Sequence, residues 1–569
     1  MLPSPVESRA PNGTFFAVYL SELFFTFAWW ETQHWRESMK RTVLLSLLVL
    51  LYAPALVVLS EDAANPALPN DIITEYGPIS GVVQADGVRI FKGIPFAAPP
   101  VGELRWKPPQ PAKKWDKIRP CVEFGPWCIQ PKQEVFGREE SPQSEDCLYL
   151  NVWTSAQSKD ERRPVMVWIH GGGFTTGSGS MKVYDGQTYA RRGIVLVTIN
   201  YRVGPLGFFA HPLLSKESEK GSSGNYGFLD QVESLKWVQR NIAAFGGDPN
   251  CVTIFGESAG AVSVGLHLVS PLSRGLFHRA ILESGSSDFI SRKLKAETNG
   301  LESSEASGER LASQLKCDAA PDVLSALRAI PAEEILRAAN PSQGLFGDRK
   351  AKYGPVIDGW VIPDLPDKMM QEGKMAPVPV MVGTNSDEGT IFLSQLPVKT
   401  VAGYQILMKT LFKDNAEELL KLFPAKEDSD VAMAINKFST VAFFVVGART
   451  TARKAAKLQP QVFMYHFTRS FPRLGAFHAA EIPYVFGNLP AAMANPQVDA
   501  ALSQTMNSFW INFALSGDPN GQGLPKWPVY TETEDKNIEL GEQIKESAGL
   551  WRTECDLFDK IFAALRAKQ

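Results

Sequence analysis

The hydrophobic residues of the chain form two patterns that alternate along the sequence. Short apolar runs have the length of buried strands, and Gly, Asn or Pro bounds each of them. These runs are Val165–Ile169, Ile194–Ile199, Val252–Phe255, Ala280–Leu282 and Val378–Val382. Other segments have helical spacing, such as Gly227–Phe245, which we expect to pack on a sheet. The alternation predicts an α/β fold whose large, mostly parallel sheet is covered by helices on both faces.

Two longer stretches, 286–354 and 396–458, are rich in helical patterns and more polar than the strand regions. We expect them to be insertions over the sheet that form a lid, and not independent domains. From about Asp71 onward the sequence has no internal repeat, low-complexity tract or long flexible linker. The pattern therefore predicts a single domain over residues 65–569.

The N-terminal region has the layout of a targeting signal. Met39 is followed by two basic residues and then by the apolar run Thr42–Leu59, as in secretory signal peptides. We expect translation to start at Met39, a signal peptide over 39–64, and a secreted or periplasmic protein, with 1–38 a non-native or untranslated upstream extension. The apolar run is 18 residues long, at the lower edge of a membrane span. An uncleaved anchor, with membrane contact, stays open as the alternative.

Composition narrows the class of protein further. Lys and Arg number 58 against 61 Asp and Glu, for a net charge of −3, and 44% of residues are hydrophobic. These values predict a globular chain with a sizeable core and exclude wholesale disorder. The balanced charge gives no electrostatic reason to expect a nucleic acid partner. Six cysteines occur without a CxxC pair or clustered histidines, so we expect no metal centre.

The chemistry of the chain is concentrated in Gly256-Glu257-Ser258-Ala259-Gly260. This G-x-S-x-G pentapeptide follows a predicted strand and precedes an apolar helical segment. In such a strand-turn-helix context, a sharp turn exposes the serine Oγ, and the flanking glycines avoid clashes with neighbouring backbone. We predict that Ser258 is a nucleophile.

A serine nucleophile needs a base, and the base needs an acid that orients it. Where the elbow motif occurs, the chain order is nucleophile, acid, histidine. His466 lies within an apolar strand pattern and is interpreted as structural, whereas His478 lies on a glycine-preceded loop after that strand. We predict His478 as the base. The acid lies after the Val378–Val382 run, where spacing alone does not separate Asp387 from Glu388.

The loop His170-Gly171-Gly172-Gly173-Phe174 follows another predicted strand. Acyl transfer requires preorganised N–H donors for the oxyanion, and an H-G-G-G loop supplies them in enzymes with this elbow. A phosphate-binding loop is the competing interpretation, but the Lys-Ser/Thr and G-x-G-x-x-G signatures of such loops are absent here. We therefore expect the loop to bind an oxyanion.

Several further motifs accompany these two in a fixed order: Phe91–Gly102, Ser144–Val152, Asn200–Gly204 and Gly224–Gln231. Together with His170–Phe174 and Gly256–Gly260 they resemble the type-B carboxylesterase/cholinesterase family, over about Ile72 to Leu565. The resemblance includes para-nitrobenzyl-esterase-like bacterial and fungal carboxylesterases. It implies an α/β-hydrolase fold that hydrolyses small-molecule carboxylic esters through an acyl-enzyme, without a cofactor.

The resemblance also assigns residues. It implies Ser258 as nucleophile, His478 as base and Glu388, in preference to Asp387, as acid. The backbone N–H groups of Gly172, Gly173 and Ala259 become the oxyanion donors.

Structural pairs follow from the same resemblance. It implies one disulfide, Cys128–Cys147, and ion pairs of Arg202 with Asp230 and of Lys92 with Glu145. Gly137 stands where cholinesterases have the tryptophan that binds a quaternary ammonium, so choline esters are disfavoured.

Two other functions stay open from the sequence. An amidase, lactonase or carbamate hydrolase would use the same triad, and no motif separates these from an esterase. The family resemblance also extends to non-catalytic binding modules that keep the fold and lose the serine. Because all three triad positions are filled here, we expect an enzyme.

Overall fold

A computed structural model describes residues 71–566 apart from 133–138, 140, 299, 492 and 494. The described residues belong to one compact unit, Leu68–Gln569. The expected upstream extension and signal peptide lie outside the described residues, as does Gly137.

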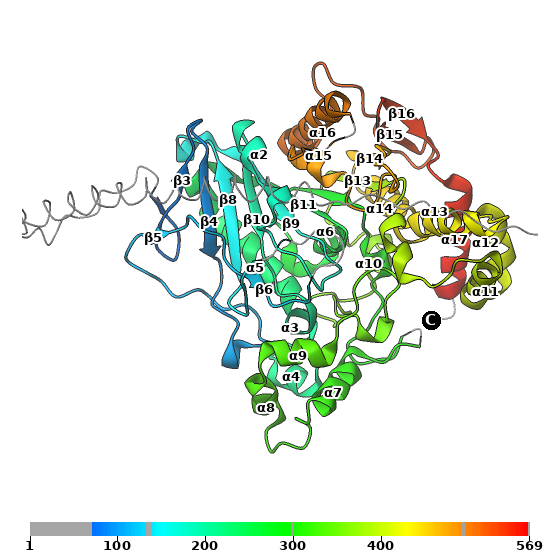
Figure 1. Cartoon of the computed structure of the whole chain (residues 1–569). Helices are drawn as coiled ribbons and strands as arrows, with labels where there is room; N and C mark the ends of the chain where they lie inside the picture. The colour runs from blue at the N-terminus through cyan, green and yellow to red at the C-terminus, as the bar shows by residue number, and fades with distance from the viewer. Residues whose placement is uncertain are drawn as a thin grey trace, which may run out of the picture. The chain divides into compact units, whose positions relative to one another are not determined.

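An 11-stranded sheet forms the centre of this unit (Figure 1). Its strands are β3 (Val82–Val83), β4 (Arg89–Pro95), β8 (Tyr149–Thr154), β9 (Arg163–Ile169), β10 (Val195–Ile199), β11 (Gly247–Glu257), β12 (Arg279–Glu283), β13 (Val380–Asn385), β14 (Val462–Phe467), β15 (Lys536–Leu540) and β16 (Ile544–Ala548). Their spatial order is β16-β15-β14-β13-β12-β11-β9-β10-β8-β4-β3. Neighbours from β15 to β10 pair in parallel. Strands β8, β4, β3 and β16 pair antiparallel at the two edges.

The five strands expected from the sequence are all present. Their ends differ by a few residues: β11 begins at Gly247, and β13 runs over Val380–Asn385 instead of ending at Val382. Every residue of β10 and β13 is buried, which is why these strands read as continuous apolar runs and do not alternate. Two short strand groups complete the β structure: β1 (Ile72–Ile73) with β2 (Pro78–Ser80) and β5 (Arg119–Pro120), and β6 (Trp127–Cys128) with β7 (Gln143–Ser144).

Helices cover both faces of the sheet. Alternate side chains of each strand point to opposite sides, so the apolar strands need helices on both faces to bury them. On one face, Val165 and Val167 of β9 belong to the same apolar cluster as residues of α5 (Tyr226–Asn241), α6 (Ala259–Val269) and α14 (Val446–Ala456). On the other face, Met166 and Trp168 pack with α2 (Gln187–Arg191), α15 (Ile482–Phe486) and α16 (Pro496–Ser516). The predicted helix on Gly227–Phe245 is therefore found as α5, followed by a 3₁₀ turn.

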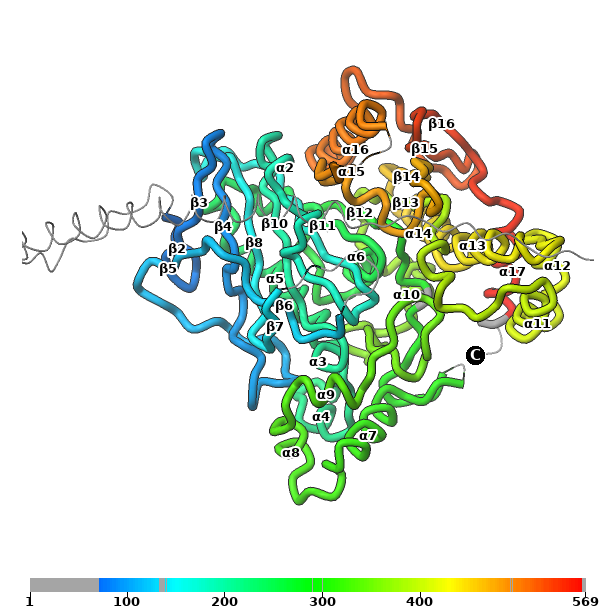
Figure 2. The backbone as a smooth tube through the Cα atoms, viewed as in Figure 1, coloured from blue at the N-terminus to red at the C-terminus, as the bar shows by residue number. Residues whose placement is uncertain are grey.

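The two insertions predicted from the sequence form separate helical groups (Figure 2). The first contains α7 (Ser304–Gln314), α8 (Val323–Ala329) and α9 (Ala332–Ala339), near α3 (Gly204–Phe208) and α4 (Pro212–Glu217). The second contains α11 (Val401–Phe412), α12 (Ala416–Leu422) and α13 (Val431–Thr440), which share an apolar cluster with α17 (Arg552–Arg566). Helix α10 (Pro366–Gln371) lies between the two insertions in the sequence.

Helix α13 continues through a π-helical turn, Val441–Val445, into α14. Among the described residues, the continuous helix Asp428–Ala456 is the one long and apolar enough to cross a membrane. However, 78% of its apolar window is buried inside the domain. It is therefore a core helix, whose π-turn residues Phe443 and Phe444 line the cavity described below.

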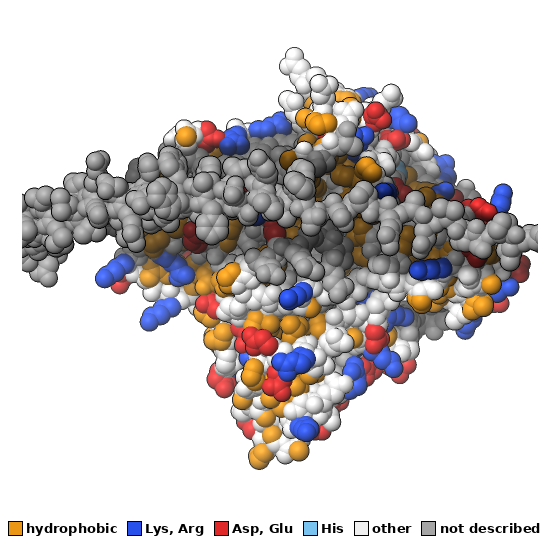
Figure 3. Space-filling view, in the orientation of Figure 1, with side chains coloured by type: hydrophobic (Ala, Val, Ile, Leu, Met, Phe, Trp, Pro, Cys, Tyr) orange, Lys and Arg blue, Asp and Glu red, His pale blue; other side chains and the backbone are white. Residues whose placement is uncertain are grey.

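Acidic and basic side chains are interspersed on the face of the molecule drawn in Figure 3. This distribution agrees with the nearly balanced charge of the sequence.

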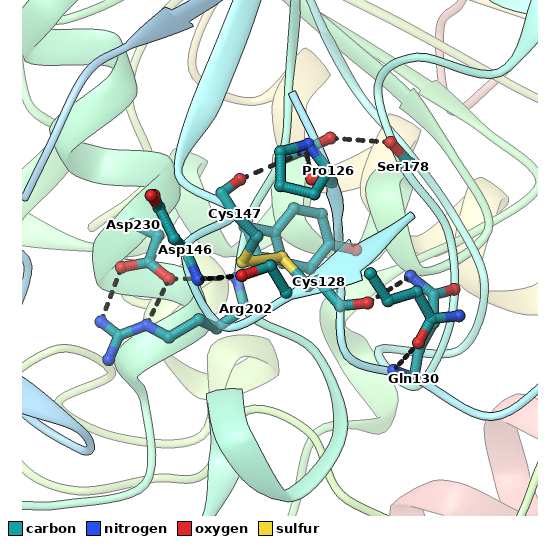
Figure 4. The surroundings of a disulfide bond; sticks show 12 residues. Pro126, Cys128, Gln130, Asp146, Cys147, Ser178, Arg202 and Asp230 are labelled. Carbon is teal, nitrogen blue, oxygen red and sulfur yellow. Dashed lines mark hydrogen bonds and ion pairs between the residues drawn. A yellow bond between two sulfur atoms is a disulfide. The ribbon is translucent and has the colours of Figure 1, made fainter. Parts of the chain in front are cut away.

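Cys128, on β6, and Cys147, just before β8, form a disulfide (Figure 4). The buried ion pair of Arg202 with Asp230 lies beside it, with Nη2 of Arg202 2.7 Å from Oδ1 of Asp230. The guanidinium also donates through Nε to the same carboxylate. This bidentate geometry is the arrangement that compensates best for removing two charges from water.

The expected pair of Lys92 with Glu145 is wrong. Both carboxylate oxygens of Glu145 accept from Arg105, at 2.7 and 2.5 Å. The ammonium of Lys92 lies instead over the ring of Phe124, 4.5 Å from its centroid. A guanidinium supplies two parallel donors to a carboxylate and an ammonium does not, so Arg105 is the better partner for Glu145.

Candidate active site

The residues predicted to carry the chemistry all follow the carboxyl ends of parallel strands. Gly172 and Gly173 follow β9, Ser258 follows β11, Glu388 follows β13 and His478 follows β14. The strand order reverses where β9 lies between β11 and β10. In open α/β sheets, such a reversal leaves a crevice at the carboxyl ends of the strands, where ligands bind.

Ser258 occupies a strained turn between β11 and α6. Its φ of 56° and ψ of −121° lie in a region that side-chain-bearing residues rarely adopt. Its backbone N–H donates to the carbonyl of Glu283 at 2.9 Å, which fixes the turn against β12. Within the part of the chain that the structure describes, the Ser258 hydroxyl has no hydrogen-bond partner, and Ser258 lines the cavity.

The two glycines of the pentapeptide are required by close packing of backbone on backbone. A Cβ on Gly256 would lie 2.5 Å from the carbonyl oxygen of Ile169, and a Cβ on Gly260 would lie 2.0 Å from the same atom. Ile169 is the last residue of β9. The elbow is thus pressed against the strand that leads into the His170–Phe174 loop, and this contact sets the serine beside that loop.

His478 is buried and its Nδ1 lies 2.6 Å from Oε2 of Glu388. The other carboxylate oxygen of Glu388 accepts from the backbone N–H of Asn385 at 2.8 Å. The competing acid, Asp387, turns to other partners: it accepts from the backbone N–H of Ala476 and from the side chain of Asn436. Glu388 contacts the imidazole, whereas Asp387 is hydrogen-bonded to the backbone of the loop that carries His478.

The Gly172–Phe174 loop has the conformation that glycine permits. Gly172 and Gly173 have φ values of 102° and 62°, and a Cβ on Gly172 would lie 2.2 Å from the carbonyl of Thr176. The Gly172 carbonyl accepts from the N–H groups of Thr175 and Thr176. No acceptor among the described residues takes the N–H of Gly172 or Gly173. Both residues line the same cavity as Ser258 and Ala259.

His478 also faces Glu257, the residue before the serine, with Nε2 3.0 Å from Oε1. Burial opposes protonation of the imidazole, but Glu257 and Glu388 outweigh it and raise the pKa of His478 to about 9. Burial raises the pKa of Glu257 to about 8, against the opposing effect of His478. The imidazole and Glu257 therefore form a close, buried ion pair, and the neighbouring carboxylates favour the protonated imidazole.

Two further buried carboxylates belong to this neighbourhood. Glu481 accepts from Ser284 and from Asn385, and Glu283 accepts from the indole N–H of Trp510 at 2.8 Å. Burial, followed by the charge of Glu388, raises the pKa of Glu481 to about 7, and burial raises the pKa of Glu283 well above its usual value. Sequence reasoning missed both residues. A glutamate directly after the apolar run Ala280–Leu282, and another three residues beyond His478, are the signals that point to them.

The site opens into a cavity of about 2030 Å³ whose wall includes Ser258 and His478. Aromatic rings pack directly on the imidazole: the centroid of Phe444 lies 4.8 Å from that of His478, and that of Phe392 lies 5.4 Å from it. Such a volume accommodates a ligand larger than most drug-sized molecules. No group of three or more His, Cys, Asp or Glu side chains in the described part of the chain is arranged to hold a metal ion.

An elbow serine, a carboxylate-bound histidine and free N–H groups on an adjoining glycine loop define a serine hydrolase with the α/β-hydrolase fold. Comparison with known families agrees, since residues 69–558 match the model of the Carboxylesterase family. The chain belongs to this family and is a carboxylic ester hydrolase.

Individual relatives extend the comparison. The chain is 40% identical over 493 residues to a fumonisin B1 esterase of Sphingopyxis macrogoltabida, covering 84% of this chain and 87% of that one. It is 36% identical to a para-nitrobenzyl esterase of Bacillus subtilis (strain 168), covering 83% and 95%. A solved structure of a PNB esterase superposes with a TM-score of 0.73 at 33% identity, covering 86% of this chain and 100% of that one.

Proposed function

We propose that Ser258, His478 and Glu388 act as the nucleophile, base and acid of the ester hydrolysis. The observation that carries this assignment is the 2.6 Å contact of His478 with Glu388 in a wall shared with the strained Ser258. Glu388 holds the imidazole through Nδ1, and this leaves Nε2 for proton transfer. The contact of Asp387 with the loop backbone supports the choice of Glu388 as the acid.

In the proposed acylation, Nε2 of His478 accepts the Ser258 proton as Oγ attacks the ester carbonyl carbon. The carbonyl oxygen becomes an oxyanion that accepts from the N–H groups of Gly172, Gly173 and Ala259. Ala259 is the first residue of α6, so its N–H points out of the helix N-terminus and favours negative charge there. The bond to the alkoxy oxygen then breaks, and His478 returns its proton to the departing alcohol.

Deacylation repeats these steps with water. His478 accepts a proton from water as the water oxygen attacks the acyl carbon, and the same proton returns to Ser258 Oγ when the acid leaves. Glu257 competes for Nε2 in the resting protein. Catalysis therefore requires Nε2 of the imidazole to leave Glu257 and form a hydrogen bond with Ser258. Catalytic hydrogen bonds that are long in an apo structure often tighten when substrate binds.

The assignment is tested with protein starting near Ala63 and its Ser258→Ala variant on p-nitrophenyl acetate, butyrate and octanoate. We expect hydrolysis by the parent and a loss of at least about 10³-fold in the variant. p-Nitroanilides of the same acids, measured in parallel, separate ester from amide specificity. Equal rates for the folded parent and the folded variant would overturn the role of Ser258.

We also propose that the domain is exported. The support is the basic-then-apolar layout after Met39 and the disulfide of Cys128 with Cys147, a bond that persists in oxidising compartments. N-terminal sequencing of the protein recovered from its natural source tests this. A mature N-terminus near residue 64 supports export, and an intact residue 39 contradicts signal cleavage.

A further inference from the structure

The wall of the active-site cavity holds more positive than negative side chains. Eight of its residues are Lys or Arg and five are Asp or Glu. Each of the five carboxylates lies 3.9 Å or less from a cation of the same wall, as in the pair of Asp364 with Lys368 at 2.6 Å and that of Asp559 with Arg453 at 2.7 Å. These pairs use four of the eight cations.

The four remaining cations are close together in the fold: Arg292, Lys293, Arg349 and Lys352. Nη1 of Arg292 donates to the carbonyl of Lys352 at 3.1 Å. The backbone of Lys293 forms an isolated parallel β-bridge with Ile357. None of the four forms an ion pair with a residue that the structure describes. One side of the cavity therefore has positive charge that no ion pair with a described residue neutralises.

Arg292 is the member of this group with buried donors left over. Its Nε and Nη2 are buried and have no hydrogen-bond partner among the described residues. The carboxylate whose charge acts on Arg292 is that of Glu302, and it is already paired with Arg310 at 2.6 Å. A buried guanidinium edge without an acceptor is costly, and a carboxylate is the acceptor that fits such an edge with two parallel hydrogen bonds.

Lys352 adds a second positive charge with free hydrogen-bond donors to this side of the cavity. Its ammonium donates to the carbonyl of Leu345 at 3.0 Å, which leaves two of its three N–H donors free. Burial and the neighbouring Arg349 lower the pKa of Lys352. A bound anion would relieve both effects, because it restores the polar surroundings that burial removes.

The group adjoins the reacting centre. The segment that ends at Arg292 begins at Gly285, where a Cβ would lie 2.4 Å from the Ser258 carbonyl oxygen. The segment that ends at Gly354 packs on Phe174 of the oxyanion loop, with 3.3 Å between an added Cβ and its ring. The aromatic side chains Phe392 and Phe444 line the cavity against His478. The cavity thus combines an apolar wall and a cationic wall beside one serine.

We propose that Arg292 and Lys352, supported by Lys293 and Arg349, bind a carboxylate carried by the ester substrate. The preferred substrates are anionic esters that join an apolar group to a carboxylate-bearing one. This inference rests on the proposed function of Ser258, and it names the class of ester that the site accepts.

The test compares pairs of esters of similar size, in which one member is neutral and the other carries a carboxylate. One pair is p-nitrophenyl octanoate and the mono-p-nitrophenyl ester of suberic acid, which places the carboxylate on the acid. The other is the butyrate ester of methyl 4-hydroxybenzoate and that of 4-hydroxybenzoate, which places it on the alcohol. For each pair the readout is the ratio of kcat/KM for the anionic ester to kcat/KM for the neutral ester.

We expect Arg292→Gln and Lys352→Gln each to lower this ratio about tenfold for at least one pair, mainly through KM. Arg292→Lys should keep part of the preference, and added salt should reduce it in the parent. Lys368→Gln is the matched control, a cavity cation already paired with Asp364, and should leave the ratio within about twofold.

Equal ratios in the parent, Arg292→Gln and Lys352→Gln for both ester pairs would overturn the proposal. A ratio that falls for one pair identifies the side of the ester that carries the carboxylate. Failure of the folded parent to hydrolyse any of the four esters, neutral or anionic, would contradict the proposed catalytic roles themselves, so the two failures are distinguishable.

Discussion

Nε2 of His478 lies 3.0 Å from Oε1 of Glu257, the residue immediately before Ser258. The nitrogen that we propose as acceptor of the serine proton therefore faces a carboxylate in the resting protein. Since Glu257 and Glu388 raise the pKa of His478 to about 9, more of the imidazole is protonated at neutral pH than in a free histidine. A protonated imidazole is not a base, so activity should rise with pH through this raised pKa.

Replacing Glu257 tests this relationship. In Glu257→Gln the negative charge that raises the pKa of His478 is gone while burial, which lowers it, remains. The acidic limb of the kcat/KM profile should move to lower pH, so the ratio of activity at pH 6 to activity at pH 9 rises. Glu283→Gln is the control, because Glu283 accepts a hydrogen bond from Trp510 and does not contact the imidazole. A limb that stays in place or moves to higher pH in Glu257→Gln would contradict the electrostatic account.

The adjacent carboxylates Asp387 and Glu388 should differ sharply on amide substitution. Glu388→Gln removes the charge that orients His478, and kcat should fall by about 10²–10⁴-fold. Asp387→Asn instead weakens the fastening of the Ala476 backbone and should lower the free energy of unfolding by about 1 kcal/mol while retaining most of kcat. Steady-state kinetics and urea titration of both variants measure these effects. A larger loss of kcat in Asp387→Asn would reverse the assignment.

The elbow depends on the contact of Gly260 with β9. A Cβ at this position would lie 2.0 Å from the Ile169 carbonyl oxygen, and neither backbone segment can yield easily because both are buried. We expect Gly260→Ala to cost about 3 kcal/mol or more in stability and to abolish hydrolysis. Gly403→Ala, on α11 where the nearest atom is a Thr400 side-chain oxygen at 3.2 Å, should retain stability and activity. A fully active, stable Gly260→Ala would refute the packing argument.

The disulfide should contribute mainly by constraining the unfolded chain. Cys128 and Cys147 are separated by 19 residues, and a loop of this size predicts a loss of about 3 kcal/mol in Cys147→Ser. Cys251→Ser, at a free and half-buried thiol, should change stability by less than about 1 kcal/mol. Urea unfolding with and without reductant checks both, because the reductant should lower the stability of the parent and not that of Cys147→Ser.

Much of the fold and the turn that carries Ser258 was predictable, because short sequence motifs directly follow the apolar runs that form the strands. The apolar runs mark the buried strands, and the G-x-S-x-G and H-G-G-G motifs lie directly after two of them. Glu388 and Asp387 were not separable by spacing, since their direction depends on how β13 ends and on the Ala476 backbone that meets Asp387. Only the fold brings that backbone close.

Long-range pairing limited the rest. The partner of Glu145 is Arg105, 40 positions away. The residues around Lys92 in the sequence do not show that the guanidinium of Arg105 lies closer to Glu145. The cationic wall of the cavity joins segments around Arg292 and Lys352, which are separated by 60 positions. Each segment is basic by itself, as Arg292-Lys293-Leu294-Lys295 and Arg349-Lys350-Ala351-Lys352, but only the fold brings the two segments together in one wall of the cavity.

Covalent trapping of the nucleophile tests the central claim most directly. The parent protein is treated with a fluorophosphonate ester, digested, and examined by mass spectrometry, with residual activity on p-nitrophenyl butyrate measured in the same samples. We expect one adduct, on the peptide containing Ser258, in proportion to the activity lost, and no adduct in Ser258→Ala. An adduct on a different residue that accounts for the lost activity, or full turnover by Ser258→Ala, would contradict the account.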